Sequence, residues 1–328
     1  MEFNVADSLG SLPPAAIAKY LREIGDTKGA GVMAAGGAAR AQNILRPRAP
    51  YTITSSQLGF IAPVAGESTA AIVGATVIDA DPTLIGTQIK ISFDAAYIYE
   101  YPGFGKHQIL CEFVGKNQIR GETEALRMAL RFSSTDKAKA SVLGVPIFLG
   151  LTVGPNGIAF EGRSVNVKSD GDETLLEVLD TAAFKSGLSL VSSVQPGLKP
   201  LVGLVQGAVK MVASRSSNCQ VHNYNLGLDF ASTSTSARLR CGSYVVAQVN
   251  DEEWNWDDFE WDRGSDALRR KKTRGDKAID FNYMVISVSP YTHVVTAKAA
   301  PEKAAATKLP SAKSPAAKQA RATKAASA

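Results

Sequence analysis

Residues 88–99 read QIKISFDAAYIY, and this stretch decides the fold class. Its large apolar side chains occupy alternate positions, and polar side chains fill most of the positions between them. A period of two is typical of a β-strand that buries one face. We predict one strand here, with its large apolar residues on a shared buried face. Those residues are Ile89, Ile91, Phe93, Tyr97 and Tyr99.

The same alternation recurs in much of the chain that follows. It is present at 109–113, 224–230 and 281–285, and also at 126–132, where good helix-forming residues compete with the strand pattern. We predict a strand at each of these places. Short strands without a regular strand–helix–strand repeat predict a mainly β protein, specifically a large antiparallel β-sandwich that is C2-like or jelly-roll-like. The same pattern argues against Rossmann and TIM-barrel folds.

Two helices are expected to form an insert at about 172–213 within the sandwich. Residues 173–187 carry an apolar stripe, with a capping aspartate before them and a glycine at their end. Residues 198–213 are apolar around most of a helix circumference. That pattern suits a helix that covers one face of the sandwich, and the alternative is a helix that meets a membrane or a partner.

The N-terminal segment 1–26 predicts a further helix, which begins at Pro13-Pro14 and ends at Gly25. Because an isolated helix of this length is marginal in water, its apolar stripe must dock on the body or on a partner. Residues 27–50 are rich in glycine and alanine and predict a flexible linker. The domain plan is a helical segment at 1–26, a linker at 27–50, a β-sandwich with its helical insert at 51–297 and a tail at 298–328.

Residues 141–160 form a run without any charged side chain. The turn signal Gly154-Pro155-Asn156-Gly157 divides this run, so we predict a buried hairpin. Insertion into a bilayer is the alternative, and together with residues 198–213 it would make the protein a membrane-acting effector.

The C-terminal tail carries most of the net charge. The chain's net charge is +5, and the seven bases and one acid of the tail contribute +6, which leaves −1 for the remaining residues. Its alanine, proline and lysine content predicts disorder. The tail resembles the Lys/Ala/Pro-rich tails of linker histones and bacterial histone-like proteins in composition alone, and this resemblance implies non-specific contact with nucleic acid or another polyanion. The candidate residues are Lys298, Lys303, Lys308, Lys313, Lys318, Arg321 and Lys324.

Residues 251–274 read DEEWNWDDFEWDRGSDALRRKKTR and hold all three tryptophans. In a regular strand, successive pairs of these aromatic residues would face opposite sides, so we predict a bulge or tight turn at Asp257-Asp258 that aligns them. The aligned rings are either buried under the sheet, with the carboxylates pairing in part with the basic residues at 269–274, or exposed for binding. The candidate binding face comprises Trp254, Trp256, Asp257, Asp258, Phe259 and Trp261.

The sequence lacks the usual catalytic motifs, namely a nucleophile elbow, a phosphate-binding loop and a zinc-protease helix. We expect no cofactor, and a weak calcium site on predicted turns is the alternative. A zinc site built from His107, Cys111, Cys219 and His222 has unsuitable spacing. A carboxylate- or calcium-dependent hydrolase centred on 251–262 stays as a third functional hypothesis. The calcium candidates are Asp79, Asp81, Asp170 and Asp172.

The leading hypothesis is a non-enzymatic binding or assembly protein. Its β-sandwich would mediate interaction with a protein partner or with further copies of the chain, and its termini would recruit a second component, the tail contacting a polyanion. Three scattered cysteines and an N-terminus without a signal-peptide pattern lead us to expect a cytoplasmic protein.

Overall fold

The computed structural model is mainly β, as the alternation predicts. The described residues belong to one compact unit, which lies within Met1–His293. The tail at 298–328 and most of the predicted insert lie outside the described residues. The structure describes residues 3–38, 49–119, 122–140, 142–168, 187–190, 206–207, 209–210, 212–213, 217–231, 236–250, 254–272, 275 and 277–292.

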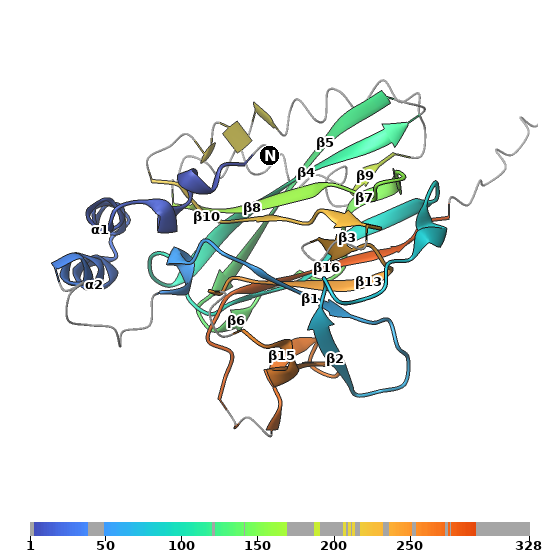
Figure 1. Cartoon of the computed structure of the whole chain (residues 1–328). Helices are drawn as coiled ribbons and strands as arrows, with labels where there is room; N and C mark the ends of the chain where they lie inside the picture. Colours follow the sequence, from blue (N-terminus) through green and yellow to red (C-terminus); the bar gives the residue numbers. More distant parts are fainter. Residues whose placement is uncertain are drawn as a thin grey trace, which may run out of the picture. The chain divides into compact units, whose positions relative to one another are not determined.

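The larger sheet has ten strands among the described residues and curls into a half-barrel (Figure 1). Its order is β15-β14-β2-β1-β13-β16-β3-β7-β9, and β6 pairs with β3 beside this path. Neighbouring strands are antiparallel except β7 and β9. The bounds are β1 Gln57–Ile61, β2 Thr69–Gly74, β3 Gln88–Ile98, β6 Ala138–Lys139, β7 Val145–Thr152, β9 Leu188–Ser189, β13 Gly242–Ala247, β14 Phe259–Asp262, β15 Ala267–Arg270 and β16 Tyr283–Pro290.

The second sheet has four antiparallel strands in the order β10-β8-β4-β5. β4 (Lys106–Ile119) and β5 (Glu122–Thr135) form a long hairpin, which confirms the predicted strand at 126–132. β8 spans Phe160–Val167 and β10 spans Cys219–Asn225. A short parallel pair, β11 (Leu228–Asp229) and β12 (Ala237–Arg238), completes the described strands.

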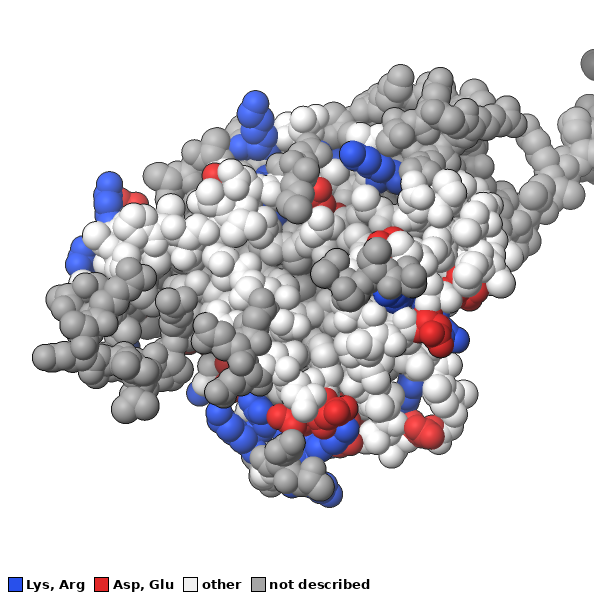
Figure 2. Space-filling model, viewed as in Figure 1, with Lys and Arg blue, Asp and Glu red and all other residues white. Residues whose placement is uncertain are grey.

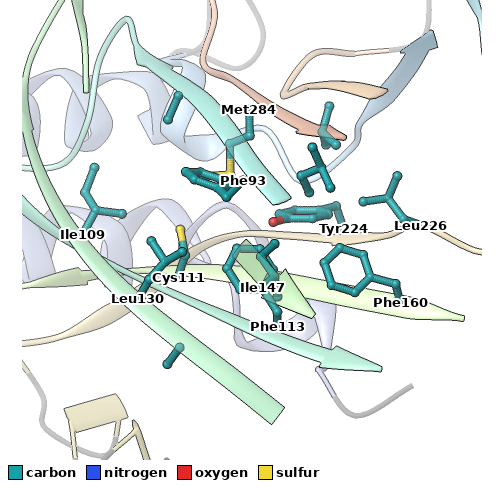
Figure 3. Close-up of a cluster of buried hydrophobic side chains, with 14 of the residues drawn as sticks. Phe93, Ile109, Cys111, Phe113, Leu130, Ile147, Phe160, Tyr224, Leu226 and Met284 are labelled. Atoms are coloured by element: carbon teal, nitrogen blue, oxygen red, sulfur yellow. The ribbon is translucent and has the colours of Figure 1, made fainter. Parts of the chain in front are cut away.

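The main hydrophobic core lies between the two sheets. Phe93 of the larger sheet contacts Phe113 of the smaller one at a ring-centroid distance of 5.7 Å, and Phe148 and Phe160 meet edge to face at 5.9 Å. Figure 3 shows Phe93 of the larger sheet beside Phe113 and Phe160 of the smaller one in this core. Fully burying one such side chain stabilises the fold by roughly 1.5–3 kcal/mol, so this layer dominates the stability of the sandwich.

Strand β3 departs from the predicted single buried face. Its pairing with β16 skips Asp94, because Phe93 pairs with Ile286 and Ala95 with Val285. Since side chains alternate along a strand, one extra residue exchanges the two faces. The prediction that Tyr97 shares a face with Ile89, Ile91 and Phe93 is therefore wrong, and Tyr99 lies beyond the end of the strand. After Asp94, Ala96 and Ile98 enter the sandwich core, while Ala95 and Tyr97 face the opposite side.

The predicted hairpin at 141–160 is also wrong. A tight turn does form, with the Gly157 amide donating to the Gly154 carbonyl at 3.1 Å, and a Cβ at Gly157 would meet the Leu228 carbonyl oxygen at 2.0 Å. The strands on either side then separate, because β7 joins the larger sheet and β8 the smaller one. The apolar side chains of both strands fill the sandwich core. No helix among the described residues is long and apolar enough to cross a bilayer.

The N-terminal helix is confirmed, and it docks on the body. α1 (Pro14–Glu23) follows two short 3-10 helices, Val5–Asp7 and Leu9–Ser11. Leu21 of α1 and Leu9 of the second 3-10 helix are buried in the main core cluster. The Asn166 amide of β8 donates to the Tyr20 hydroxyl at 3.1 Å. Two further 3-10 helices span Pro50–Thr52 and Pro82–Leu84.

Part of the predicted linker at 27–50 is helical instead. α2 spans Thr27–Ala38, and the Asp26 carboxylate caps it by accepting a hydrogen bond from the Gly29 amide at 2.7 Å. The four glycines of α2 lower its helix propensity, while Ala30 packs in the main core cluster and Met33 packs against it. In the predicted insert, the described residues between 206 and 213 are helical, and Val209 and Val212 are buried in the core.

A buried ion cluster lies beneath the N-terminal segment. Glu112 is fully buried, and its carboxylate contacts the guanidinium groups of Arg127 and Arg163, the latter at 2.7 Å. Burial raises the pKa of Glu112, and the charge of Arg163 opposes that rise. Because the Arg163 guanidinium also lies 4.6 Å from the ring centroid of Phe3, the cluster holds the start of the chain against the sheet.

Buried His222 makes stability depend on pH. Burial lowers its pKa to about 3, whereas the unfolded chain keeps an ordinary value of about 6.5. Because the folded pKa is depressed, the stabilising contribution is complete above about pH 6.5 and is lost progressively toward pH 3, by about 1.4 kcal/mol per pH unit. Denaturant unfolding of wild type and His222→Gln at several pH values across this window tests the assignment. The variant should lose less stability than wild type on acidification. An equal dependence of the free energy of unfolding on pH in the two proteins would contradict the assignment to His222.

Candidate functional site

The tryptophan-rich stretch folds around the predicted tight turn. A 3-10 helix spans Trp256–Asp258, and the Asn255 side chain caps it by accepting from the Asp257 amide at 2.9 Å. The turn brings Trp254 onto Phe259, with stacked rings 4.7 Å apart. The sequence prediction of an aligned aromatic set is therefore confirmed.

The exposed binding face, in contrast, is not what the structure shows. Trp256 and Trp261 are 7% and 9% exposed, Phe259 is buried and Trp254 is partly buried. These rings form a second core against the face of the larger sheet that points away from the sandwich core. Asp257 is exposed beside the buried rings. Trp256 and Trp261 therefore offer a sugar or other ligand almost no surface for stacking, and only part of the Trp254 side chain is exposed.

The second core supports a cavity of about 410 Å³ beside the edge strand β15. Its wall includes Tyr97, which stacks on buried Tyr283 with ring centroids 5.4 Å apart and an interplanar angle of 19°. The Tyr283 hydroxyl accepts a hydrogen bond from the Leu268 amide at 3.0 Å, which fixes β15 over the ring. We call this cavity the aromatic–basic pocket. Its principal lining residues are Tyr97, Arg269, Arg270, Lys277, Ile279 and Tyr283.

Three cations and two carboxylates set the charge of the aromatic–basic pocket. Asp280 accepts from Arg270 at 2.9 Å and from Lys277 at 2.7 Å, while Arg269 contacts Asp262. Figure 2 shows basic and acidic side chains intermixed at the lower end of the molecule. The predicted partial pairing of the acidic stretch with 269–274 is thus confirmed for Arg269, and one positive charge remains in excess.

The ion pairs hold the cations at the rim of the pocket. Burial raises the pKa of Asp280, but hydrogen bonds from Lys277 and Arg270 outweigh it and lower the pKa overall. The Arg270 guanidinium also lies 5.0 Å from the ring centroid of Phe259. Arg269 and Lys277 keep 57% and 69% of their side-chain surface exposed. Both can therefore reach an anionic ligand.

The other predicted site residues do not come together. Asp81 accepts hydrogen bonds from the amide and hydroxyl of Thr83 and so caps the 3-10 helix at Pro82–Leu84. Asp170 and Asp172 lie outside the described residues, as do the seven tail bases. Within the described ranges, no three His, Cys, Asp or Glu side chains are grouped to hold a metal ion.

The four residues weighed for zinc have separate local roles. His107 pairs with Asp136 at 2.9 Å, and His222 pairs with the Ser56 hydroxyl at 2.7 Å. Cys111 is packed in the sandwich core and Cys219 is partly buried near the N-terminal segment.

Sequence reasoning missed most of the aromatic–basic pocket. It assigned Tyr97 to the sandwich core and did not consider Lys277, while Tyr283 entered only as part of an alternating strand. The basic run that begins at Arg269 was the one available signal. Comparison of the chain with protein-family models, curated proteins and solved structures gives no match.

Truncation of the second core should destabilise the fold strongly. Trp256 packs against Gly59, where a Cβ would lie 2.8 Å from the indole ring. We expect Trp256→Ala to lower the free energy of unfolding by about 3–5 kcal/mol, because it leaves a cavity in a dense cluster. Val77→Ala is the matched control, since Val77 is 76% exposed and should change stability by less than about 0.5 kcal/mol. Denaturant unfolding measures both, and equal effects would contradict a buried Trp256.

Proposed function

We propose that this chain is a non-enzymatic binding and assembly protein that holds a polyanion. The aromatic–basic pocket on the β-sandwich body and the basic tail at 298–328 would act together. The observation that carries the proposal is the stacked pair Tyr97 and Tyr283 beside the exposed cations Arg269 and Lys277.

The two parts would contribute different terms to binding. The tail offers seven bases and can neutralise roughly six phosphates, which gives a large salt-sensitive attraction without sequence preference. The pocket has an excess of only one positive charge, so its electrostatic share is small. It offers instead a fixed aromatic surface, which positions the ligand on the body.

Assembly would follow from the same two contributions, one from the tail and one from the pocket. A polyanion repeats the same charged unit, so one polymer can bind several copies of the protein. Within one copy, binding of the tail raises the effective concentration of the polymer at the body, and binding of the body does the same at the tail. The N-terminal segment docks on its own body through Leu9 and Leu21, which leaves the C-terminal end as the recruiting terminus. Three free cysteines support a reducing setting such as the cytoplasm.

The burial of the apolar segments and of the tryptophans argues against the two alternative functions. The described parts of 141–160 and 198–213 contribute Phe148, Phe160 and Val212 to the main core, so a membrane-acting effector would have to unpack the sandwich. A hydrolase centred on 251–262 would have two of its three tryptophans, Trp256 and Trp261, buried and out of reach of a substrate.

Salt-dependent binding tests the proposal. A fluorescent single-stranded oligonucleotide is titrated with wild type and with a full-length variant that has all seven tail bases changed to Gln. The slope of log K against log salt should fall by roughly four in the tail variant, because each phosphate contact contributes about 0.7. A smaller loss is expected for Arg269→Ala/Lys277→Ala.

Lys19→Ala provides the control for this titration, because Lys19 is 76% exposed on α1, outside the pocket. Its slope should match wild type. Absence of binding by the wild-type protein to this probe and to heparin at low salt would overturn the proposal.

A further inference from the structure

A strip of aromatic and basic side chains continues from the pocket along β3. Tyr99 lies just beyond the end of β3 at Ile98, two residues after Tyr97, and both tyrosines are partly exposed. The ammonium group of Lys137 lies 5.7 Å from the ring centroid of Tyr99. Lys139 of β6 pairs directly with Tyr97. We call Tyr97, Tyr99, Lys137 and Lys139, together with the pocket cations, the tyrosine strip.

Backbone strain is concentrated at this strip. Lys137 has φ +57° and Asp266 has φ +45°, and they are the two non-glycine residues with positive φ in the described part of the chain. This conformation costs about 1–2 kcal/mol for a residue with a Cβ. Asp266 lies 3.9 Å from the Lys139 ammonium group, which also donates to the Ser265 carbonyl at 3.3 Å. Both strained turns therefore position lysines beside the tyrosines.

We propose that the tyrosine strip binds single-stranded nucleic acid. Bases would stack on Tyr97 and Tyr99, and the phosphates would follow Lys137, Lys139 and Arg269. This inference rests on the proposed polyanion-binding function and names the class of polyanion. Aromatic side chains flanked by cations are the arrangement with which proteins hold unpaired bases, because every base has a π-face and every nucleotide a phosphate.

The spacing of the tyrosines favours a single strand over a duplex. Two residues of extended chain span at most about 7 Å. In a duplex, each base is covered on both faces by stacked neighbours about 3.4 Å away, so it has no free face to place on a tyrosine. A single strand can separate its bases and place one on each ring. Duplex DNA would offer the strip only its phosphates.

Carboxylates near the strip limit its electrostatic share. Asp266 and Asp280 pair with the cations, and the carboxyl groups of Glu100 and Asp136 lie near Lys137. The strip would therefore select the form of nucleic acid by stacking, while the tail supplies most of the attraction. The two contributions are separable, because stacking changes the ratio of single-strand to duplex affinity and the tail changes the salt dependence.

The test compares a labelled oligo(dT) of about 20 nucleotides with a duplex of the same length, a size that exceeds the site sizes typical of one domain. Wild type should prefer the single strand. Tyr97→Leu/Tyr99→Leu should weaken single-strand binding by at least about tenfold and leave duplex binding and the salt slope nearly unchanged. Tyr97→Phe/Tyr99→Phe should retain the preference, because phenylalanine keeps the stacking face.

Tyr291→Leu is the matched control. Tyr291 is partly exposed, and its amide donates to the Gln88 carbonyl at the opposite end of β3. Thermal unfolding of each variant confirms the fold before binding is compared. Equal wild-type affinity for single strand and duplex, or an unchanged preference in a folded Leu variant, would overturn this inference while leaving polyanion binding intact. Loss of binding to every polyanion would overturn the proposed function itself.

Discussion

The skipped residue Asp94 in β3 is the constraint on which the rest of the architecture depends. Before it, Phe93 fills the sandwich core, and after it Ile98 takes over that face. Tyr97 consequently turns to the other side. Without the shift, Tyr97 would point into a core that is already closely packed, and the aromatic–basic pocket would lose one wall. Pairing with β16 keeps the shift in place, because the register on each side of Asp94 is fixed by several ladder contacts.

The second core and this register change together form the aromatic–basic pocket. The buried ring of Trp256 and the stacked pair Tyr97 and Tyr283 hold β15 against the sheet, so that its arginines stand at the rim of the pocket. Most of those cations have carboxylate partners, which positions them without creating a strongly positive field. The proposed function therefore combines a rigid aromatic surface on the body with a highly charged tail. Each part supplies what the other lacks.

The sequence predicts the fold class well because alternation is a local signal. The strand at 126–132 and the tight turn at Asp257-Asp258 follow from patterns of a few residues. The hairpin expected at 141–160 failed because a turn signal does not say which sheet the next strand joins. The prediction of the face on which Tyr97 lies failed for a related reason. The shift at Asp94 is set by pairing with a strand almost two hundred residues later in the chain. The pocket draws on three separate segments, and local patterns do not reveal such long-range contacts.

Photochemical cross-linking of the full chain to a single-stranded oligonucleotide, followed by peptide mapping, tests the central claim most directly. Short-range cross-links form only where a base lies against a side chain. The account predicts adducts on the peptide that contains Tyr97 and Tyr99. An excess of unlabelled single strand should abolish these adducts, whereas an excess of unlabelled duplex should not. Adducts confined to the tail at 298–328, or found on the N-terminal segment instead, would contradict a binding surface built by the register shift in β3.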